Sequence, residues 1–344
     1  MSGGVTKDGV QDAHPGREAV SQLQRTGAKT PRSRDRTRGG EQPVVGEAEF
    51  RSYYGKPVIN KPVWKAPDIA GYLFLGGLAG ASSVIAGAAT VTGRKSLARA
   101  LKLSSTVAIG ISGAALVHDL GRPARFFNML RVVKPSSPMS VGSWLLAAFA
   151  PCSVAASFST VTGLLEPVGA LGTAGAAVIG PAVATYTAAL ISDTAVPAWH
   201  EGYREMPFVF AASAMSAAGG MGMLAAPLDE SGPARLIGVV GGAAELGLIE
   251  LMKHNMGEVG DAFTESRKAH RYERAARIAT GAGIAVGTLF GKRSRLAAAA
   301  AGAGLLAGSA FARFAIFEAG LESAEDPRYT VVPQRRRIEE RSRA

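Results

Sequence analysis

Long apolar stretches alternate with polar connectors along most of the chain. No charged residue occurs from Ile69 to Gly93, a stretch of 25 residues. As a helix this stretch is longer than the roughly 30 Å thickness of a bilayer's hydrocarbon core. Similar stretches recur as far as Phe317. The pattern predicts eight membrane-spanning helices, at residues 69–93, 101–118, 141–163, 168–190, 207–228, 234–252, 275–290 and 296–317.

An even number of spans places both termini on one side of the membrane, which we call the terminal side. The longer connectors, residues 119–140, 191–206 and 253–274, lie on the same side. This side also holds most of the Lys and Arg residues, including 12 in residues 1–65. Because positive connectors stay in the cytoplasm, we expect cytoplasmic termini.

The chain divides into three predicted regions. Residues 1–55 are polar and basic with little apolar periodicity, which predicts a disordered arm and not a secretory signal peptide. Residues 56–320 are predicted to form one membrane domain, and residues 321–344 a charged tail. Small residues at four-residue spacing either bring helix backbones together or are simply tolerated in lipid; the pairs are Gly76/Gly80, Gly238/Gly242 and Gly304/Gly308.

Composition supports a membrane protein and excludes several other classes. Hydrophobic residues make up 47% of the 344 residues and charged residues 19%, below the roughly 25% of soluble domains. The net charge of +11 is better explained by the orientation of the chain in the membrane, or by binding to anionic lipid, than by binding to nucleic acid. The single cysteine, Cys152, excludes an intramolecular disulfide, a CxxC zinc site or a thiolate-bound cluster within the chain. Because His118 and His254 lie only at span edges, we expect neither metal nor haem.

Ionisable residues within spans are costly and therefore mark candidate functional positions. Glu245 lies in the sixth predicted span with Glu250 five residues later, and Arg313 lies near the end of the eighth. Glu245 is either a protonatable relay or a hydrogen-bonded packing residue, and Arg313 is either its counter-charge or a side chain that reaches the interface. We predict a proton route through Asp119, Glu245, Glu250 and Arg313. Asp119 alternatively pairs with Arg122 to shape the connector.

Polar and aromatic residues gather on the terminal side. They include His118, Asp119, Asp193 and His254, with Trp64, Tyr186, Trp199, His200 and Tyr203. An aromatic belt at the membrane interface is the alternative explanation for Trp199 and Tyr203.

Several blocks together resemble the NrfD/PsrC family of membrane subunits of respiratory oxidoreductases. They are Pro62–Trp64, Gly71–Gly77, His118–Pro123 with Arg125–Phe126, Ser137–Trp144, Tyr186–Thr187, Val196–Trp199 with Pro207, Arg313–Phe314 and Glu318–Gly320. The resemblance covers roughly residues 55–330. It implies eight transmembrane helices in two four-helix bundles, within a bacterial plasma membrane.

The resemblance also implies a function. Such a subunit is not catalytic alone; it exchanges electrons between a ferredoxin-like iron–sulfur subunit and menaquinone, beside a molybdopterin catalytic subunit. Tyr186 matches the tyrosine that binds quinone in the family. The family also has an imidazole at the start of the first span, and this chain has no histidine there. Asn60, Trp64 and His118 therefore complete the predicted quinone site. Partner contacts are expected at Arg122, Arg125, Trp199 and His200. The alternative is a proton-coupled secondary transporter, which typically shows inverted repeats that are not evident here.

Overall fold

A computed structural model describes residues 58–120, 122 and 124–343. The predicted N-terminal arm, residues 1–55, lies outside this part. Within the described residues the regular structure is entirely helical, as predicted. Eight helices have 20 residues or more: α2 (Ala66–Val91), α3 (Lys95–Asp119), α5 (Pro138–Thr162), α6 (Glu166–Ser192), α8 (Met206–Ala225), α9 (Gly232–Met256), α11 (Arg267–Leu289) and α12 (Arg295–Glu325).

Local sequence signals set several ends of these helices. Proline stands in the first turn of α2, α5, α6, α8 and α9, where its missing N–H costs no intrahelical bond. The side chains of Ser266 and Ser294 accept hydrogen bonds from backbone N–H groups at the starts of α11 and α12. Gly163, with φ of +69°, ends α5 in the left-handed conformation. Of the eight long helices, all except α3 therefore have a local sequence signal at one end or both.

Each predicted span coincides with one long helix. Six of them, α2, α3, α5, α6, α8 and α12, are long and apolar enough to cross a membrane. The other two, α9 and α11, carry charged residues near their terminal-side ends, including Glu250, Lys253, Arg267 and Arg271. Shorter helices occupy the connectors and the tail: α4 (Arg125–Met129), α7 (Pro197–His200), the 3₁₀-helix η1 (Gly257–Asp261), α10 (Ala262–Glu265) and α13 (Arg328–Arg343).

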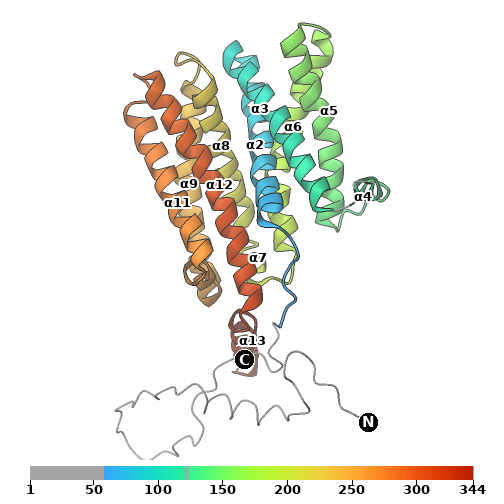
Figure 1. The fold of residues 1–344 in the computed structure, drawn as a ribbon, viewed down its shortest axis with the longest axis vertical. Helices are drawn as coiled ribbons and strands as arrows, with labels where there is room; N and C mark the ends of the chain where they lie inside the picture. Colours follow the sequence, from blue (N-terminus) through green and yellow to red (C-terminus); the bar gives the residue numbers. More distant parts are fainter. Residues whose placement is uncertain (1–57, 121, 123, 344) are drawn as a thin grey trace, which may run out of the picture. The chain divides into compact units, whose positions relative to one another are not determined.

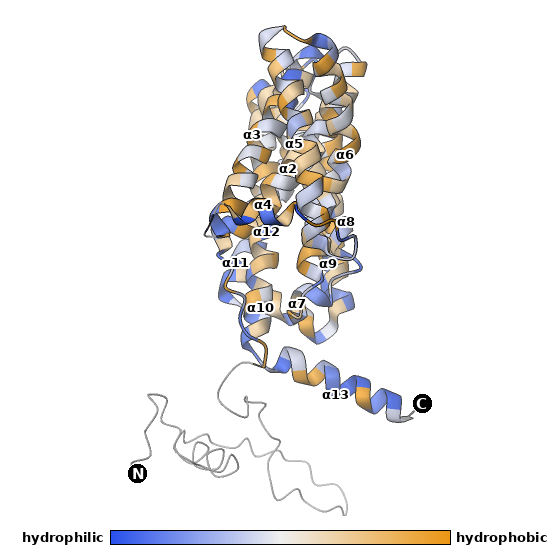
Figure 2. Ribbon diagram, turned by 90° about the vertical axis from the view of Figure 1, so that its right-hand side faces the viewer, coloured by the Kyte–Doolittle hydropathy of each residue, from blue (hydrophilic) through white to orange (hydrophobic). Residues whose placement is uncertain are grey.

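The long helices pack in two neighbouring sets (Figure 1). In the first helix group α2 contacts α3 and α6, and α5 contacts α3 and α6. In the second helix group α8 contacts α9 and α12, and α11 contacts α9 and α12. The groups meet mainly through α2, α6, α8 and α12. Figure 2 shows hydrophobic residues along the helix bodies and hydrophilic residues gathered at helix ends and in α13.

Both ends of the described chain lie on the same side of the helices. The Lys61 ammonium, before α2, pairs with the Glu325 carboxylate at the end of α12. The connectors 120–137, 193–205 and 257–266 share this end, whereas the opposite loops, 92–94, 163–165, 226–231 and 290–294, have at most six residues. This agrees with the prediction of an even number of antiparallel spans.

The last helix is longer than its predicted span. The apolar stretch ends at Phe317, but α12 continues to Glu325. Gly320 in this extension lies directly under the indole of Trp199, and Ser323 Oγ accepts a hydrogen bond from the Ala198 N–H, 3.1 Å away. Packing against α7 therefore carries the helix beyond the apolar stretch. The charged tail then forms a further helix, α13.

Glycines allow the backbones of neighbouring helices to touch. A Cβ atom on Gly80 of α2 would lie 2.4 Å from the Gly180 carbonyl oxygen of α6. On Gly219 of α8 it would lie 2.4 Å from the Gly238 Cα of α9. A Cβ on Gly302 of α12 would meet the same kind of obstacle at Gly220 O of α8. Because lipid is as apolar as the side chains, such close packing is what favours association.

We predict that the Gly219→Ala substitution destabilises the protein. Its methyl group meets backbone that cannot rotate away, which we expect to lower the free energy of unfolding by about 1–3 kcal/mol. Gly247→Ala on α9 is the matched control, because no atom lies within 4 Å of its Cβ position. That change should leave stability unchanged or raise it by up to about 1 kcal/mol. Thermal unfolding in detergent, followed by circular dichroism, compares the two; equal midpoints would refute the packing argument.

Candidate functional site

A row of polar side chains leads inward along one face of α2. Asp68 and Tyr72 are four residues apart and therefore lie one above the other. The Asp68 Oδ2 atom is 3.0 Å from the His118 Nδ1 atom of α3. The His118 side chain is 68% exposed and that of Asp68 only 18%. The pair thus connects the terminal-side surface with the interior of the first helix group.

One turn further in, the hydroxyl of Tyr72 is hydrogen-bonded to the hydroxyl of Tyr186 on α6. Tyr72 is almost fully buried and Tyr186 is buried to a similar degree. The Tyr186 ring lies against α5 at Gly142, where any side chain would collide with the ring. Three helices therefore hold the predicted quinone tyrosine. In a hydrogen bond between two hydroxyl groups, one group donates its proton and the other accepts. The accepting hydroxyl can still donate its own proton to another group.

The other polar residues near this row take different positions. Asp119, the last residue of α3, lies within electrostatic reach of Asp68 and Lys65. Asn60 is exposed, ahead of α2. Arg122 and Arg125 are exposed in the connector that follows α3. The structure thus brings His118, but not Asn60, into direct contact with the polar row.

Trp64 and Trp199 stack on each other, with ring centroids 5.7 Å apart. The Trp199 indole N–H donates to the Ile316 carbonyl oxygen at 2.9 Å, and the ring packs on Phe317. Trp199 is completely buried. It therefore lies inside the protein and not on the surface where a partner contact was predicted, and it joins α7 to α12 and to the segment before α2. His200, the next residue, is exposed beside Tyr203.

The second helix group contains a buried polar cluster. Glu245 of α9 and Arg313 of α12 are both almost inaccessible to solvent. Arg313 Nη2 donates to the Phe210 carbonyl oxygen at 2.9 Å, and its guanidinium carbon lies 3.5 Å from the Phe210 ring centroid. Arg313 is the charged group that acts electrostatically on the Glu245 carboxyl. Ser213 shares a hydrogen bond of 2.7 Å with Ser309.

Several buried polar atoms of the second helix group have no hydrogen-bond partner within the described residues. They include both carboxylate oxygens of Glu245, Nε and Nη1 of Arg313, and the hydroxyls of Ser216 and Thr280. Buried polar atoms without partners are costly. Glu245 and Arg313 therefore remain candidate functional residues, and their predicted roles stay predictions.

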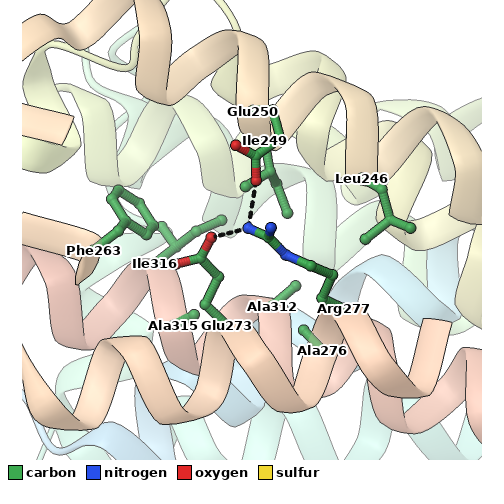
Figure 3. A pocket seen from close by; sticks show the side chains of 10 residues that line it. All are labelled: Leu246, Ile249, Glu250, Phe263, Glu273, Ala276, Arg277, Ala312, Ala315 and Ile316. Atoms are coloured by element: carbon green, nitrogen blue, oxygen red, sulfur yellow. Dashed lines mark hydrogen bonds and ion pairs between the residues drawn. The ribbon is translucent and has the colours of Figure 1, made fainter. Parts of the chain in front are cut away.

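Glu250 lies apart from Glu245, at the exposed mouth of a cavity of about 210 Å³ between α9, α11 and α12. Glu250 accepts a hydrogen bond of 2.5 Å from Arg277, which also donates to Glu273 at 2.7 Å (Figure 3). Lys253 is likewise 2.7 Å from Glu273. Apolar side chains line the rest, namely Leu246, Ile249, Phe263, Ala276, Ala312, Ala315 and Ile316. An ionic network therefore borders an otherwise apolar cavity.

The tail helix α13 is attached to the terminal-side connectors by ion pairs. Arg336 donates to Glu258 at 2.6 Å, and Arg337 pairs with Glu201. At the start of α13, Arg328 pairs with Glu265 of α10. The hydrogen bond from Arg328 holds the pKa of the Glu265 carboxyl below its usual value. These contacts join α7, η1 and α10 into one polar surface at the terminal end.

Several residues of these sites are not among those predicted from the sequence. Tyr72 was part of the family resemblance but had no assigned role, although its four-residue spacing from Asp68 signals a shared helix face. Ser213, Ser309, Lys253, Glu273 and Arg277 were also not singled out. Small hydroxyls are common in apolar helices, so no local signal marks those that face a buried charge. Among the described residues, no group of three or more His, Cys, Asp or Glu side chains is arranged to hold a metal ion.

Long apolar helices with buried polar clusters define a multi-pass membrane protein. Residues 57–229 match the family described as polysulphide reductase NrfD. Since this match covers half of the chain, the protein belongs to the NrfD family, which suggests a membrane subunit of a redox complex. No curated protein matches the chain. The matched region contains the polar row of α2 and Tyr186, whereas Glu245, Arg313 and the cavity lie beyond it.

We predict that Lys253→Met destabilises the protein, because Glu273 has a largely buried side chain, only 8% exposed, and would keep only Arg277 as its counter-charge. Removing one partner of a buried pair costs about 3–5 kcal/mol, and the remaining arginine should reduce this to about 1–3 kcal/mol. Lys268→Met, at an exposed position of α11, is the control and should change little. Thermal unfolding in detergent measures both.

A second variant tests the cause. In the double substitution Lys253→Met with Glu273→Leu, the buried carboxylate that Lys253 neutralised is gone as well, so part of the lost stability should return. Additive losses from the two substitutions would show that the contact does not couple them.

Proposed function

We propose that this protein is the membrane anchor and quinone-reactive electron-transfer subunit of a respiratory molybdopterin and iron–sulfur oxidoreductase complex. The observation that carries the proposal is the buried Tyr72–Tyr186 hydroxyl pair in the part of the chain that matches the family. Tyr186 is the residue that the resemblance assigns to the quinone. Its bond to Tyr72 fixes the orientation of the hydroxyl before any ligand binds.

Quinone reduction consumes two electrons and two protons, so a site needs hydrogen-bond donors for the carbonyl oxygens and a supply of protons. The free proton of the tyrosine pair supports the first role, since it can be donated to one quinone carbonyl. His118, hydrogen-bonded to Asp68 and exposed on the terminal side, supports the second role. An imidazole ring carries two nitrogens, one of which can accept a proton while the other donates one, so it is suited to pass protons inward. In this proposal Trp64 borders the site, and Asn60 and Asp119 lie at its entrance.

Electrons must arrive from another subunit in this mechanism. The single cysteine, Cys152, cannot hold an iron–sulfur cluster. We propose that a ferredoxin-like iron–sulfur subunit docks on the terminal end, near His200 and the polar surface formed by α7, η1, α10 and α13, and that a molybdopterin subunit binds to it. The quinone is menaquinone in this proposal.

The membrane arrangement follows from the same proposal. All eight long helices cross a bacterial plasma membrane as two four-helix bundles, with the termini in the cytoplasm. The exposed cations of α11, including Arg267 and Arg271, support the orientation because they lie on the terminal side. The less apolar helices α9 and α11 are included because they pack against α8 and α12, which are candidate spans.

Glu245 and Arg313 extend the proposed proton route into the second helix group. Their mid-helix positions also favour the alternative of a proton-coupled transporter, since that mechanism needs ionisable groups inside the membrane. Solute movement by the purified chain in liposomes would support the transporter. The hydrogen-bonded tyrosine pair is not required for that alternative, so the tyrosine variants below separate the two functions.

We predict that Tyr186→Phe slows quinone reduction by the intact complex at least about tenfold, because a charge-assisted hydrogen bond contributes about 1.5–3 kcal/mol. Tyr72→Phe should act in the same direction, since it frees Tyr186 to rotate. Tyr272→Phe on α11 is the matched control and should leave the rate unchanged. The measurement is turnover with a soluble menaquinone analogue, alongside gel filtration to confirm that the complex is assembled. Normal turnover in both Tyr186 and Tyr72 variants would reject this site.

A second prediction concerns the partner. Purification of the tagged full-length chain from its native membrane should recover a cysteine-rich subunit with the absorption spectrum of iron–sulfur clusters. Reversing the charge of the terminal surface, as in the Glu201→Lys and Glu258→Lys double variant, should release α13 and reduce that recovery. Recovery of the chain alone under mild detergent would contradict the proposal.

A further inference from the structure

The short helix α4 and the residues after it expose an unusual amount of apolar surface. We call residues 124–134 the α4 segment. No residue of α4 is buried, although its sequence contains two phenylalanines and a methionine. Phe127 is 70% exposed, and Val132 and Val133 are 61% and 68% exposed. Such a patch is unfavourable in water and marks a surface that another apolar phase covers.

The α4 segment is also positively charged. Arg125, Arg131 and Lys134 are exposed, and no acidic residue occurs in residues 120–137. Nearby acids therefore do not neutralise these cations. A ligand that matches both properties must offer an apolar layer beside a layer of negative charge.

The position of the segment identifies that ligand. It connects α3 and α5, which are both candidate membrane spans, so it lies where two helices leave the bilayer. Figure 1 shows α4 to the side of the long helices, next to α5, and not beneath them near α7 and α13. A subunit docked on the terminal end would lie below the helices, whereas lipid surrounds their sides.

Hydrogen bonds attach the segment to the first turns of α5. The Val132 carbonyl oxygen accepts from Ser140 Oγ at 2.9 Å and from the Trp144 indole N–H at 3.3 Å. The Lys134 N–H donates to Ser140 Oγ at 3.0 Å. Trp144 itself is part of the exposed apolar surface. Tryptophan with its N–H bonded and its ring exposed is typical of the membrane interface.

We propose that the α4 segment binds the anionic surface of the bilayer, with its apolar side chains among the acyl chains and its three cations at lipid phosphate groups. Cations close to an anionic lipid surface are attracted to it. Arg125 was predicted to contact a partner subunit. In this proposal it contacts lipid instead, and the segment holds the ends of α3 and α5 at a defined depth.

The test uses the full-length protein in mild detergent and phosphatidylglycerol as the probe, with phosphatidylcholine as the neutral comparison. Native mass spectrometry counts the lipid molecules that each variant retains. The triple variant Arg125→Gln, Arg131→Gln and Lys134→Gln should lose its preference for phosphatidylglycerol by at least about tenfold. The matched control removes three exposed cations of α11, in Arg267→Gln, Lys268→Gln and Arg271→Gln, where no large exposed apolar side chain lies among them. It should retain the preference.

A second readout follows the apolar face. Phe127→Ser should weaken quenching of tryptophan fluorescence by brominated phosphatidylglycerol in nanodiscs, since Trp144 is the one exposed tryptophan. Equal lipid retention by the triple variant and the unmodified protein would overturn the proposal. Unchanged retention together with loss of a co-purifying subunit would assign the segment to a protein partner instead, which also overturns it.

Discussion

Direct contact between helix backbones is the constraint on which this structure depends. Within lipid, burial of apolar side chains gives helices little reason to associate, so dispersion contacts between closely packed helices must supply it. Gly80 against Gly180 joins α2 to α6, whereas Gly219 and Gly220 join α8 to both α9 and α12. A methyl group at these points would separate helices that also carry the polar residues. The glycines therefore decide the geometry of the buried sites as well as the packing.

The position of Arg313 shows this dependence. Its guanidinium reaches from α12 to the Phe210 carbonyl of α8. The Nη2 atom is also 3.5 Å from the position that a Cβ atom would occupy on Gly77 of α2. Arg313 therefore lies where the two helix groups meet. Its position depends on the spacing of α2, α8 and α12, which the glycine contacts set.

The sequence predicted the elements of the fold better than the contacts between them. The lengths and positions of the apolar stretches are local properties, and each coincides with a helix. Helix ends in polar regions were less predictable: α12 runs beyond Phe317 because Gly320 fits under Trp199, a contact between segments more than 100 residues apart. The sequence also predicted that Trp199 contacts a partner. A tryptophan beside a span suits an interface and a protein core equally well, so only long-range contacts show which environment it occupies.

The sequence alone determined that the chain is helical, with apolar stretches long enough to cross a membrane, that it contains a single cysteine, and that it resembles the NrfD family. These conclusions rest on hydrophobicity, residue counts and order along the chain. Only the tertiary structure decided that Tyr72 is the partner of Tyr186, that Asp68 connects to His118, and that Glu245 and Glu250 lie in different surroundings. These pairings depend on which helices are neighbours and how each is rotated, because every helix offers several faces and only packing selects the one that is buried.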